Sequence, residues 1–221
     1  MHFKRFESAE ALVQAAADLL LEHFQAEYDL PHAVMLSGGK TPLGVYSQII
    51  QSRIKASASL NVLFSDERMV PPDSAESNYG NASSMIQALG LPAARVMRVH
   101  TRHSLNQAAN DYDKQLREFL AHGGKIPLGL LGLGLDGHTA SLFSFADIER
   151  GLGRYAVGVP RHQGHDRVSV TPDLLNRIGK VVFLVSGKEK AKVVEQLRQS
   201  PRKLVAGRAV ANAASVEVWV A

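Results

Sequence analysis

Cysteine is absent from this chain of 221 residues. The lack of a thiol excludes a disulfide framework, a thiolate metal site and a cysteine nucleophile. Apolar runs long enough to cross a membrane are absent too, and the amino-terminal residues lack the apolar core of a signal peptide. We therefore expect a cytoplasmic protein that has no membrane partner.

The chain also lacks a strong excess of either charge. Its 25 basic and 21 acidic residues give a net charge of +4, which favours anionic ligands. The basic residues are spread along the sequence and form no run interleaved with aromatic residues, so we expect no nucleic-acid partner. A phosphorylated metabolite fits scattered cations better. His100 with His103 and His162 with His165 lack a carboxylate set beside them, so we expect loop histidines and no metal site.

Short apolar segments alternate with amphipathic ones along the whole chain, a pattern typical of the α/β fold class. We expect strands near residues 33–36, 61–64, 95–99, 126–133, 155–159, 168–170, 180–185 and 215–220. We expect helices near residues 8–27, 42–50, 78–88, 104–121 and 186–199, with a short one after 172. Continuous apolar strands indicate a mainly parallel sheet that helices cover on both faces. No linker or repeat divides the sequence, so residues 1–221 are expected to form a single domain.

The most informative segment follows the apolar run at 126–133. It is a glycine-rich turn that carries Asp136 and His138. In open α/β sheets, ligands bind at the carboxyl ends of the strands, where an acid and an imidazole are candidates for general acid–base catalysis. The glycines also spell G-x-G-x-x-G, but the acidic residue that a dinucleotide site needs about 20 positions later is missing. We therefore expect no nucleotide cofactor.

Another strand end carries the sequence Ser-Gly-Gly-Lys-Thr at residues 37–41. Gly38 and Gly39 let the backbone approach an anion, and a helix with Thr41 as its N-cap offers free amides and a positive dipole end. Lys40 or Thr41 would add a donor. The alternative is a glycine turn with an ordinary helix cap, and the P-loop pattern is not matched.

Charged residues follow the strand expected near 61–64. Arg68 is suited to pairing with a phosphate or carboxylate, and Asp66 to accepting hydrogen bonds from sugar hydroxyls. A solvated turn explains the same charges equally well.

A lysine stands at the start of the helix expected at 186–199. Ser186 and Glu189 have the spacing of a capping box, which places Lys188 in the first helical turn. A cation is unfavourable beside the positive end of a helix dipole unless an anion lies between them, and Arg167 would supply a second charge to that anion. The alternative is a lysine that extends into solvent.

One protein family shares four stretches with this chain, in the same order and spacing. They are residues 37–42, 65–71 with 77–79, 132–143 and 186–191, and the likeness covers essentially the whole sequence. By these stretches the chain resembles the 6-phosphogluconolactonases, which are similar in fold to glucosamine-6-phosphate deaminases and ribose-5-phosphate isomerases. The resemblance implies a modified Rossmann-like, three-layer α/β/α sandwich. It also implies hydrolysis of 6-phospho-D-glucono-1,5-lactone to 6-phosphogluconate in the oxidative pentose phosphate pathway, with no cofactor.

The same resemblance implies roles for individual residues. His138 would be the general base that activates water, and Asp136 would orient it. The phosphate pocket would consist of Gly38, Gly39, Thr41, Arg167 and Lys188. The sugar and lactone side would be lined by Asp66, Arg68 and Asn78. Two residues depart from the family pattern: Lys40 stands where a small serine is common and would add to the phosphate site or crowd it, and Ser144 stands where proline usually follows Leu-Phe.

Two other functions are open at this point. The aminosugar-phosphate deaminases share the Asp-Gly-His motif but continue with Ile-Ala-Phe-Asn-Glu-Pro, whose glutamate assists ring opening. Here the motif continues with Thr139, and no acid follows until Asp147, which favours the lactonase. A sugar-phosphate-binding protein without catalysis would keep the anion sites but has no use for His138. We expect a monomer or a small homo-oligomer.

Overall fold

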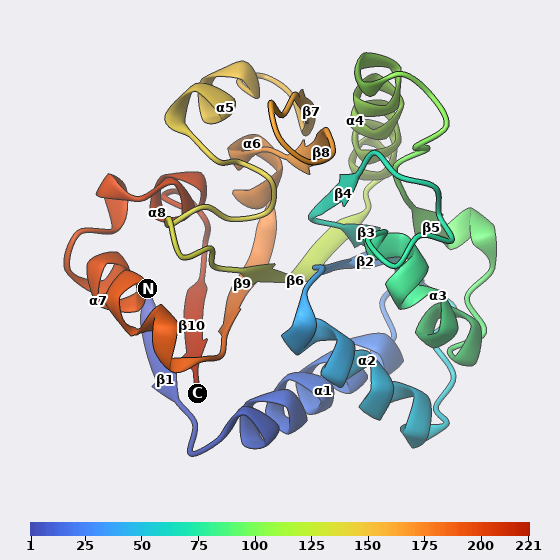
Figure 1. The fold of residues 1–221 in the computed structure, drawn as a ribbon. Helices are drawn as coiled ribbons and strands as arrows, with labels where there is room; N and C mark the ends of the chain where they lie inside the picture. Colours follow the sequence, from blue (N-terminus) through green and yellow to red (C-terminus); the bar gives the residue numbers. More distant parts are fainter.

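Seven strands form one sheet in which every neighbouring pair is parallel (Figure 1). In spatial order they are β1 (His2–Arg5), β10 (Val216–Val220), β9 (Ile178–Val185), β6 (Lys125–Gly132), β2 (His32–Leu36), β3 (Leu60–Phe64) and β5 (Val96–Met97). The computed structural model describes all residues from 1 to 221. The parallel sheet expected from the apolar pattern is confirmed, and β1 is a strand that the pattern missed.

Helices cover both faces of this sheet. They are α1 (Ala9–Gln25), α2 (Lys40–Ser52), α3 (Asn78–Ala88), α4 (Leu105–Ala121), α5 (Phe145–Arg150), α6 (Pro172–Leu175), α7 (Ala191–Gln199) and α8 (Val205–Ala209), with short 3₁₀ turns at Ala93–Arg95, Lys188–Lys190 and Pro201–Lys203. One core lies under α1, α2 and α3, and the other under α4, α6, α7 and α8. Along β9, Val181 and Phe183 enter one core and Val182 and Leu184 the other, so the strand is a continuous apolar run. The three-layer α/β/α sandwich is thereby confirmed.

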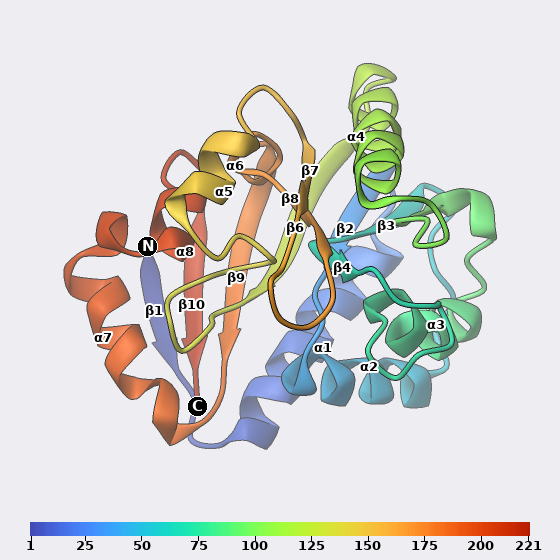
Figure 2. The same cartoon turned by 45° about the horizontal axis from the view of Figure 1, so that its top comes forward.

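A second, antiparallel sheet stands beside the carboxyl ends of the central strands (Figure 2). It consists of β4 (Asp66–Arg68), β8 (Arg167–Val170) and β7 (Ala156–Val159). Ser65 connects the two sheets, because its N–H donates to the carbonyl of Leu36 over 2.8 Å and its carbonyl accepts from Val170 over 2.9 Å. The charged residues 66–68, read from the sequence as a turn, are therefore a short strand.

Two helix starts differ from their cap signals. α2 begins at Lys40, two residues earlier than expected, with Gly39 as N-cap at a φ of 109° that favours glycine, so Thr41 lies inside the helix. No capping box forms at residues 186–189, because Gly187, with a φ of 111°, takes the N-cap position of a 3₁₀ turn that precedes α7. Both segments border the carboxyl end of the sheet, so each shift changes which side chains face a ligand there.

A capping box does form at α5, which the sequence pattern left as a loop. The Ser144 hydroxyl accepts from the N–H of Asp147 over 3.2 Å, and the Asp147 carboxylate accepts from the N–H of Ser144 over 2.9 Å. Ser144, the residue that departs from the family's proline, thus begins a helix.

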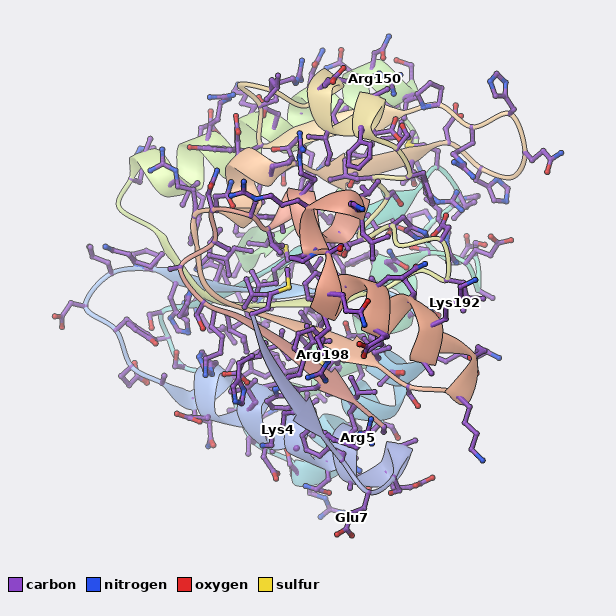
Figure 3. The ribbon with its side chains drawn as sticks, turned by 90° about the vertical axis from the view of Figure 1, so that its left-hand side faces the viewer. Lys4, Arg5, Glu7, Arg150, Lys192 and Arg198 are labelled. Carbon is purple, nitrogen blue, oxygen red and sulfur yellow. The ribbon has the colours of Figure 1, made fainter.

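The first and the last strand of the chain lie side by side, since β1 pairs in parallel with β10 from His2 and Glu217 onward. Figure 3 shows this side of the molecule, where Arg198 of α7 lies over the β1 strand, with its guanidinium 4.2 Å from the centre of the Phe3 ring. None of the helices combines the length and the apolar character that crossing a membrane requires.

Candidate active site

A small polar cavity opens where the carboxyl ends of β2 and β6 meet β4 and the start of α3. Its volume is about 220 Å³, and its lining consists of Ser37, Gly38, Gly39, Asp66, Arg68, Asn78, Gly132, Leu133, Gly134, His138, Ala140 and Lys190. Most of these residues come from the strand ends singled out in the sequence. The topology therefore brings those segments together at one edge of the sheet, as expected for an open α/β fold.

His138 is held by the glycine-rich turn that follows β6. Its Nδ1 lies 2.5 Å from Oδ1 of Asp136, and its backbone N–H donates to the same oxygen over 3.2 Å. The turn needs its glycines: a Cβ on Gly134 would lie 2.1 Å from His138 Nδ1, and Gly137 adopts a φ of 84°. The glycines of this segment thus serve the histidine.

The contact with Asp136 determines which nitrogen of the imidazole is available. An ionised carboxylate only accepts hydrogen bonds, so the neutral ring carries its proton on Nδ1 and presents the lone pair of Nε2 to the cavity. Burial raises the pKa of Asp136, but the hydrogen bonds from the ring and backbone of His138 outweigh it, and the pKa lies below its ordinary value. Phe143 packs against the imidazole with ring centres 4.6 Å apart, and the Arg161 guanidinium lies 3.8 Å from the centre of the Phe143 ring.

Asp66 is fixed on the opposite wall by two serine hydroxyls. Ser65 donates to Oδ1 and Ser141 to Oδ2, each over 2.7 Å. Ser141 is itself placed by a hydrogen bond from its N–H to the hydroxyl of Ser169 over 3.1 Å. Ser141 is therefore a support for Asp66, and the orientation of this carboxylate is determined before any ligand binds.

Glu67 has no counterpart among the residues that the sequence singled out. It is 2 % exposed, and its carboxylate accepts from the N–H groups of Arg68, Asn78 and Tyr79, each over 2.8 Å, and from the Ser77 hydroxyl over 3.1 Å. Burial raises the pKa of Glu67, and the three backbone N–H groups act in the opposite direction. Glu67 thus ties β4 to the first turn of α3. Its negative charge lies at the positive end of the α3 helix dipole, which is favourable.

Arg68 lines the cavity, and Arg167 lies next to it on the neighbouring strand, outside the lining. The register of β4 against β8 pairs Arg68 with Arg167, so the two side chains leave the same face of the small sheet. Burial lowers the pKa of Arg167, and the neighbouring Arg68 charge lowers it further. Like charges at directly paired positions destabilise a sheet. An anion between the two guanidiniums would remove that repulsion.

The loop after β2 approaches the cavity with its backbone. A Cβ on Gly38 would lie 2.0 Å from Oδ1 of Asn78, so only glycine fits beside that amide. Asn78 in turn donates its Nδ2 to the carbonyl of Asp66 over 2.8 Å. Gly39 lines the cavity at the N-cap of α2, whereas the side chains of Lys40 and Thr41 do not.

One lysine of the 3₁₀ turn at Lys188–Lys190 lines the cavity, and it is Lys190. Its ammonium group donates to the carbonyl of Leu133, whereas Lys188 is exposed and lies outside the lining. Residues 188–190 form a 3₁₀ turn and not the first turn of an α-helix, so their side chains point in other directions than a capping box would predict. Lys190 is thus the lysine that lines this cavity, and Lys188, which the sequence singled out, does not line it.

The histidine pairs have ordinary polar neighbours. His103 lies 2.9 Å from Asp111, and His165 lies 3.6 Å from Glu76. The structure contains no group of three or more histidine, aspartate or glutamate side chains placed to ligate a metal ion.

Comparison with known proteins agrees with this geometry. A sequence model of the family described as glucosamine-6-phosphate isomerases/6-phosphogluconolactonase matches residues 7–219. The chain belongs to this family. It is 27% identical over 194 residues to the 6-phosphogluconolactonase of Haemophilus influenzae, covering 85% of this chain and 83% of that protein. It is 33% identical over 173 residues to the 6-phosphogluconolactonase of Thermotoga maritima, covering 76% of each.

A solved structure extends the likeness to the whole fold. The 6-phosphogluconolactonase from Trypanosoma cruzi superposes with a TM-score of 0.83 at 27% sequence identity, over 99% of this chain and 94% of that one. The resemblance drawn from the four sequence stretches is therefore confirmed. Within this glucosamine-6-phosphate isomerase/6-phosphogluconolactonase family member, the cavity at His138 is the candidate active site.

Proposed function

We propose that this protein hydrolyses 6-phospho-D-glucono-1,5-lactone to 6-phosphogluconate in the oxidative pentose phosphate pathway. The observation that carries the proposal is His138, which Asp136 holds by Nδ1 so that Nε2 faces a cavity flanked by two arginines. An oriented base together with an anion site is what water attack on a phosphorylated lactone requires.

The phosphate binds at the cationic side of the cavity. Arg68 and Arg167 supply two charges there, and the α2 N-terminus at Gly39 supplies backbone N–H groups and a positive dipole end. Asp66 and Asn78 also line the cavity. The Asp66 carboxylate accepts hydrogen bonds from the sugar hydroxyls, and the Asn78 amide accepts or donates them. The phosphate is bound away from the reacting carbonyl. It orients the lactone and takes no part in the bond changes.

The reaction then proceeds in two proton transfers. His138 Nε2 takes a proton from water as the water oxygen bonds to the lactone carbonyl carbon, and Asp136 stabilises the imidazolium that forms. The negative charge on the former carbonyl oxygen is stabilised by the Lys190 ammonium or by backbone N–H groups of the 136–139 turn. When the bond to the ring oxygen breaks, the imidazolium returns its proton to that oxygen, which becomes a hydroxyl of 6-phosphogluconate.

One observation separates this function from the aminosugar-phosphate deaminase. The first acid after the Asp-Gly-His motif is Asp147, which is buried and accepts hydrogen bonds from Phe143, Ser144 and Arg150. It forms the cap of α5 and does not line the cavity. A ring-opening acid at the place expected for the deaminase is therefore missing, whereas a lactonase needs an activated water and a stabilised oxyanion.

The test is a side-by-side assay of the purified protein with fresh 6-phosphogluconolactone and with glucosamine 6-phosphate. We expect acid release from the lactone well above its uncatalysed rate and no ammonia from the aminosugar. Ammonia release would favour the deaminase, and inactivity on both with sugar-phosphate binding retained would favour a binding protein. We expect it to act as a single domain, as a monomer or small homo-oligomer in the cytoplasm, without cofactor, nucleic acid or membrane.

A further inference from the structure

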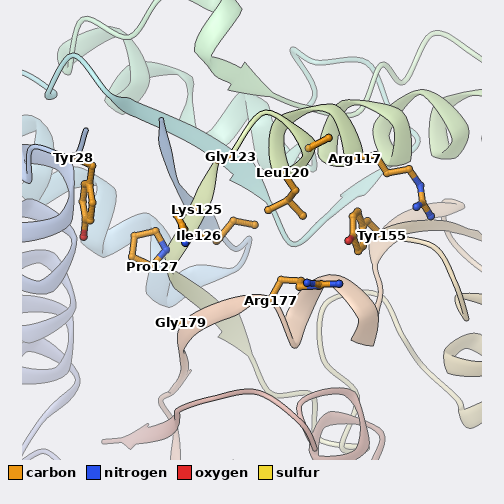
Figure 4. Close-up of a pocket in the computed structure, with 12 residues that line it drawn as sticks. Tyr28, Arg117, Leu120, Gly123, Lys125, Ile126, Pro127, Tyr155, Arg177 and Gly179 are labelled. Carbon is orange, nitrogen blue, oxygen red and sulfur yellow. The ribbon is translucent and has the colours of Figure 1, made fainter. Parts of the chain in front are cut away.

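A second cavity, larger than the candidate active site, lies at the opposite edge of the sheet. Its volume is about 890 Å³, within the range of small-molecule sites. It opens at the amino ends of β6 and β9, between the carboxyl end of α4 and the residues before β7 (Figure 4). Since β6 spans the eight residues from Lys125 here to Gly132 at the active site, the two cavities lie roughly 25 Å apart.

The charged residues that line this second cavity are all basic. Its lining includes Arg117, Lys125 and Arg177 and no acidic residue. Arg117 is neutralised by Asp113, whose Oδ2 accepts from its Nε over 2.8 Å. Lys125 and Arg177 are exposed and form no ion pair or side-chain hydrogen bond within the protein. Two unpaired cations therefore border the cavity.

The remaining walls are flat and apolar. Tyr28 lies at one end of the cavity and Tyr155 at the other, with the side chain of Ile126 between them (Figure 4). Tyr28 is 41% exposed, although an aromatic ring of this size gains from burial. Tyr155 packs under the Arg117 guanidinium, 5.0 Å from the ring centre. Tyr28 also packs against His32, with ring centres 4.4 Å apart, so each ring contacts the protein and lines the cavity with its remaining surface.

From the two unpaired cations and the exposed ring of Tyr28, we infer that this cavity binds a small amphipathic anion with a flat apolar body. The body packs against the apolar wall of the cavity beside Tyr28, and the acid group pairs with Arg177 and Lys125. An anionic group there gains charge-assisted hydrogen bonds from side chains that have no competing partner. The site is separate from the one proposed for the sugar phosphate, which is mainly polar and lined by a different set of residues.

The test is a fluorescence titration with 8-anilinonaphthalene-1-sulfonate, whose apolar aromatic rings carry a sulfonate. We expect saturable binding to the native protein that 6-phosphogluconate does not displace. The double variant Lys125→Ala/Arg177→Gln should raise the Kd at least about tenfold. The matched control, Lys192→Ala/Arg202→Gln, removes the same two charges from exposed positions near α7, where Figure 3 labels Lys192, and should leave the Kd within about twofold of the wild type.

Each of the other results would overturn the inference. They are the absence of saturable binding, displacement by 6-phosphogluconate, an unchanged Kd in the Lys125/Arg177 variant, and an equal loss in the control variant. Thermal unfolding of every variant is measured alongside, because this dye also binds loosely packed states. If the double variant is not folded, Arg177→Gln alone is titrated, with at least a severalfold weaker Kd expected. The titration does not depend on catalytic activity, so failure of the proposed lactonase reaction would leave its outcome interpretable.

Discussion

Glu67→Gln removes one oxygen from the carboxylate that anchors α3 to β4. The change keeps the size and shape of the side chain, but the amide has an oxygen on one side only and an NH₂ group on the other. In the native protein, one carboxylate oxygen accepts from Arg68 and Asn78 and the other from Tyr79 and Ser77. In the better of its two orientations, the glutamine therefore points its NH₂ group at the N–H of Tyr79.

The size of the effect follows from that one unsatisfied donor. Burial raises the pKa of Glu67, and the backbone N–H groups that it accepts from lower it, so the matched donors are what offsets the burial of this carboxylate. Leaving a buried N–H of Tyr79 without an acceptor costs about 1–3 kcal/mol. Each kcal/mol lowers the melting temperature of a chain this long by about 2–4 °C. Because Arg68 and Asn78 line the cavity, KM should rise as well.

Thermal or urea unfolding measures the first effect and steady-state kinetics with the lactone measures the second. Glu7→Gln is the matched control, since Glu7 is exposed at the start of α1 (Figure 3) and its substitution should change the free energy of unfolding by less than about 0.5 kcal/mol. A Glu67→Gln protein as stable as the Glu7→Gln protein would refute the role of Glu67 as the anchor.

Three further substitutions, one of them with a matched control, test the cavity. Arg167→Ala should raise KM about tenfold or more with kcat largely retained, because it removes a charged partner of the phosphate; an unchanged KM would place the phosphate elsewhere. Lys190→Ala should reduce kcat/KM, whereas Lys188→Ala, which removes the same charge from an exposed position, should leave it near the wild-type value; equal effects would contradict the turn at 188–190. Gly38→Ala should displace the amide that its Cβ would meet at 2.0 Å and raise KM, and a wild-type KM would show that this close approach is not needed.

Much of the fold could be predicted from apolar periodicity, since strands buried on both faces, such as β2 and β9, are continuous apolar runs. β1 and β4 could not. β1 is mostly exposed, and its pairing depends on β10 at the other end of the chain. β4 is three charged residues that form a strand only because β8, about a hundred residues later, pairs with it. Such long-range pairing has no local signal in the sequence.

The candidate site divides in the same way. Asp136 and His138 lie on one turn, and the family resemblance implied the contact that the structure shows. Glu67 was missed because a buried carboxylate between two polar neighbours looks like part of a solvated turn. Lys190 was missed because the chain enters α7 through a 3₁₀ turn, which moves the inward-facing position by two residues. The position of a side chain that depends on one backbone rotation, or on packing against another helix, has no local signal in the sequence.

The central claim, that His138 is the general base of a lactonase, is tested most directly by the kcat of His138→Ala with 6-phosphogluconolactone, after subtraction of the uncatalysed rate. General-base assistance accounts for about 10²–10⁴-fold in rate, so kcat should fall by that factor while 6-phosphogluconate still binds. A kcat near that of the wild type would contradict the account.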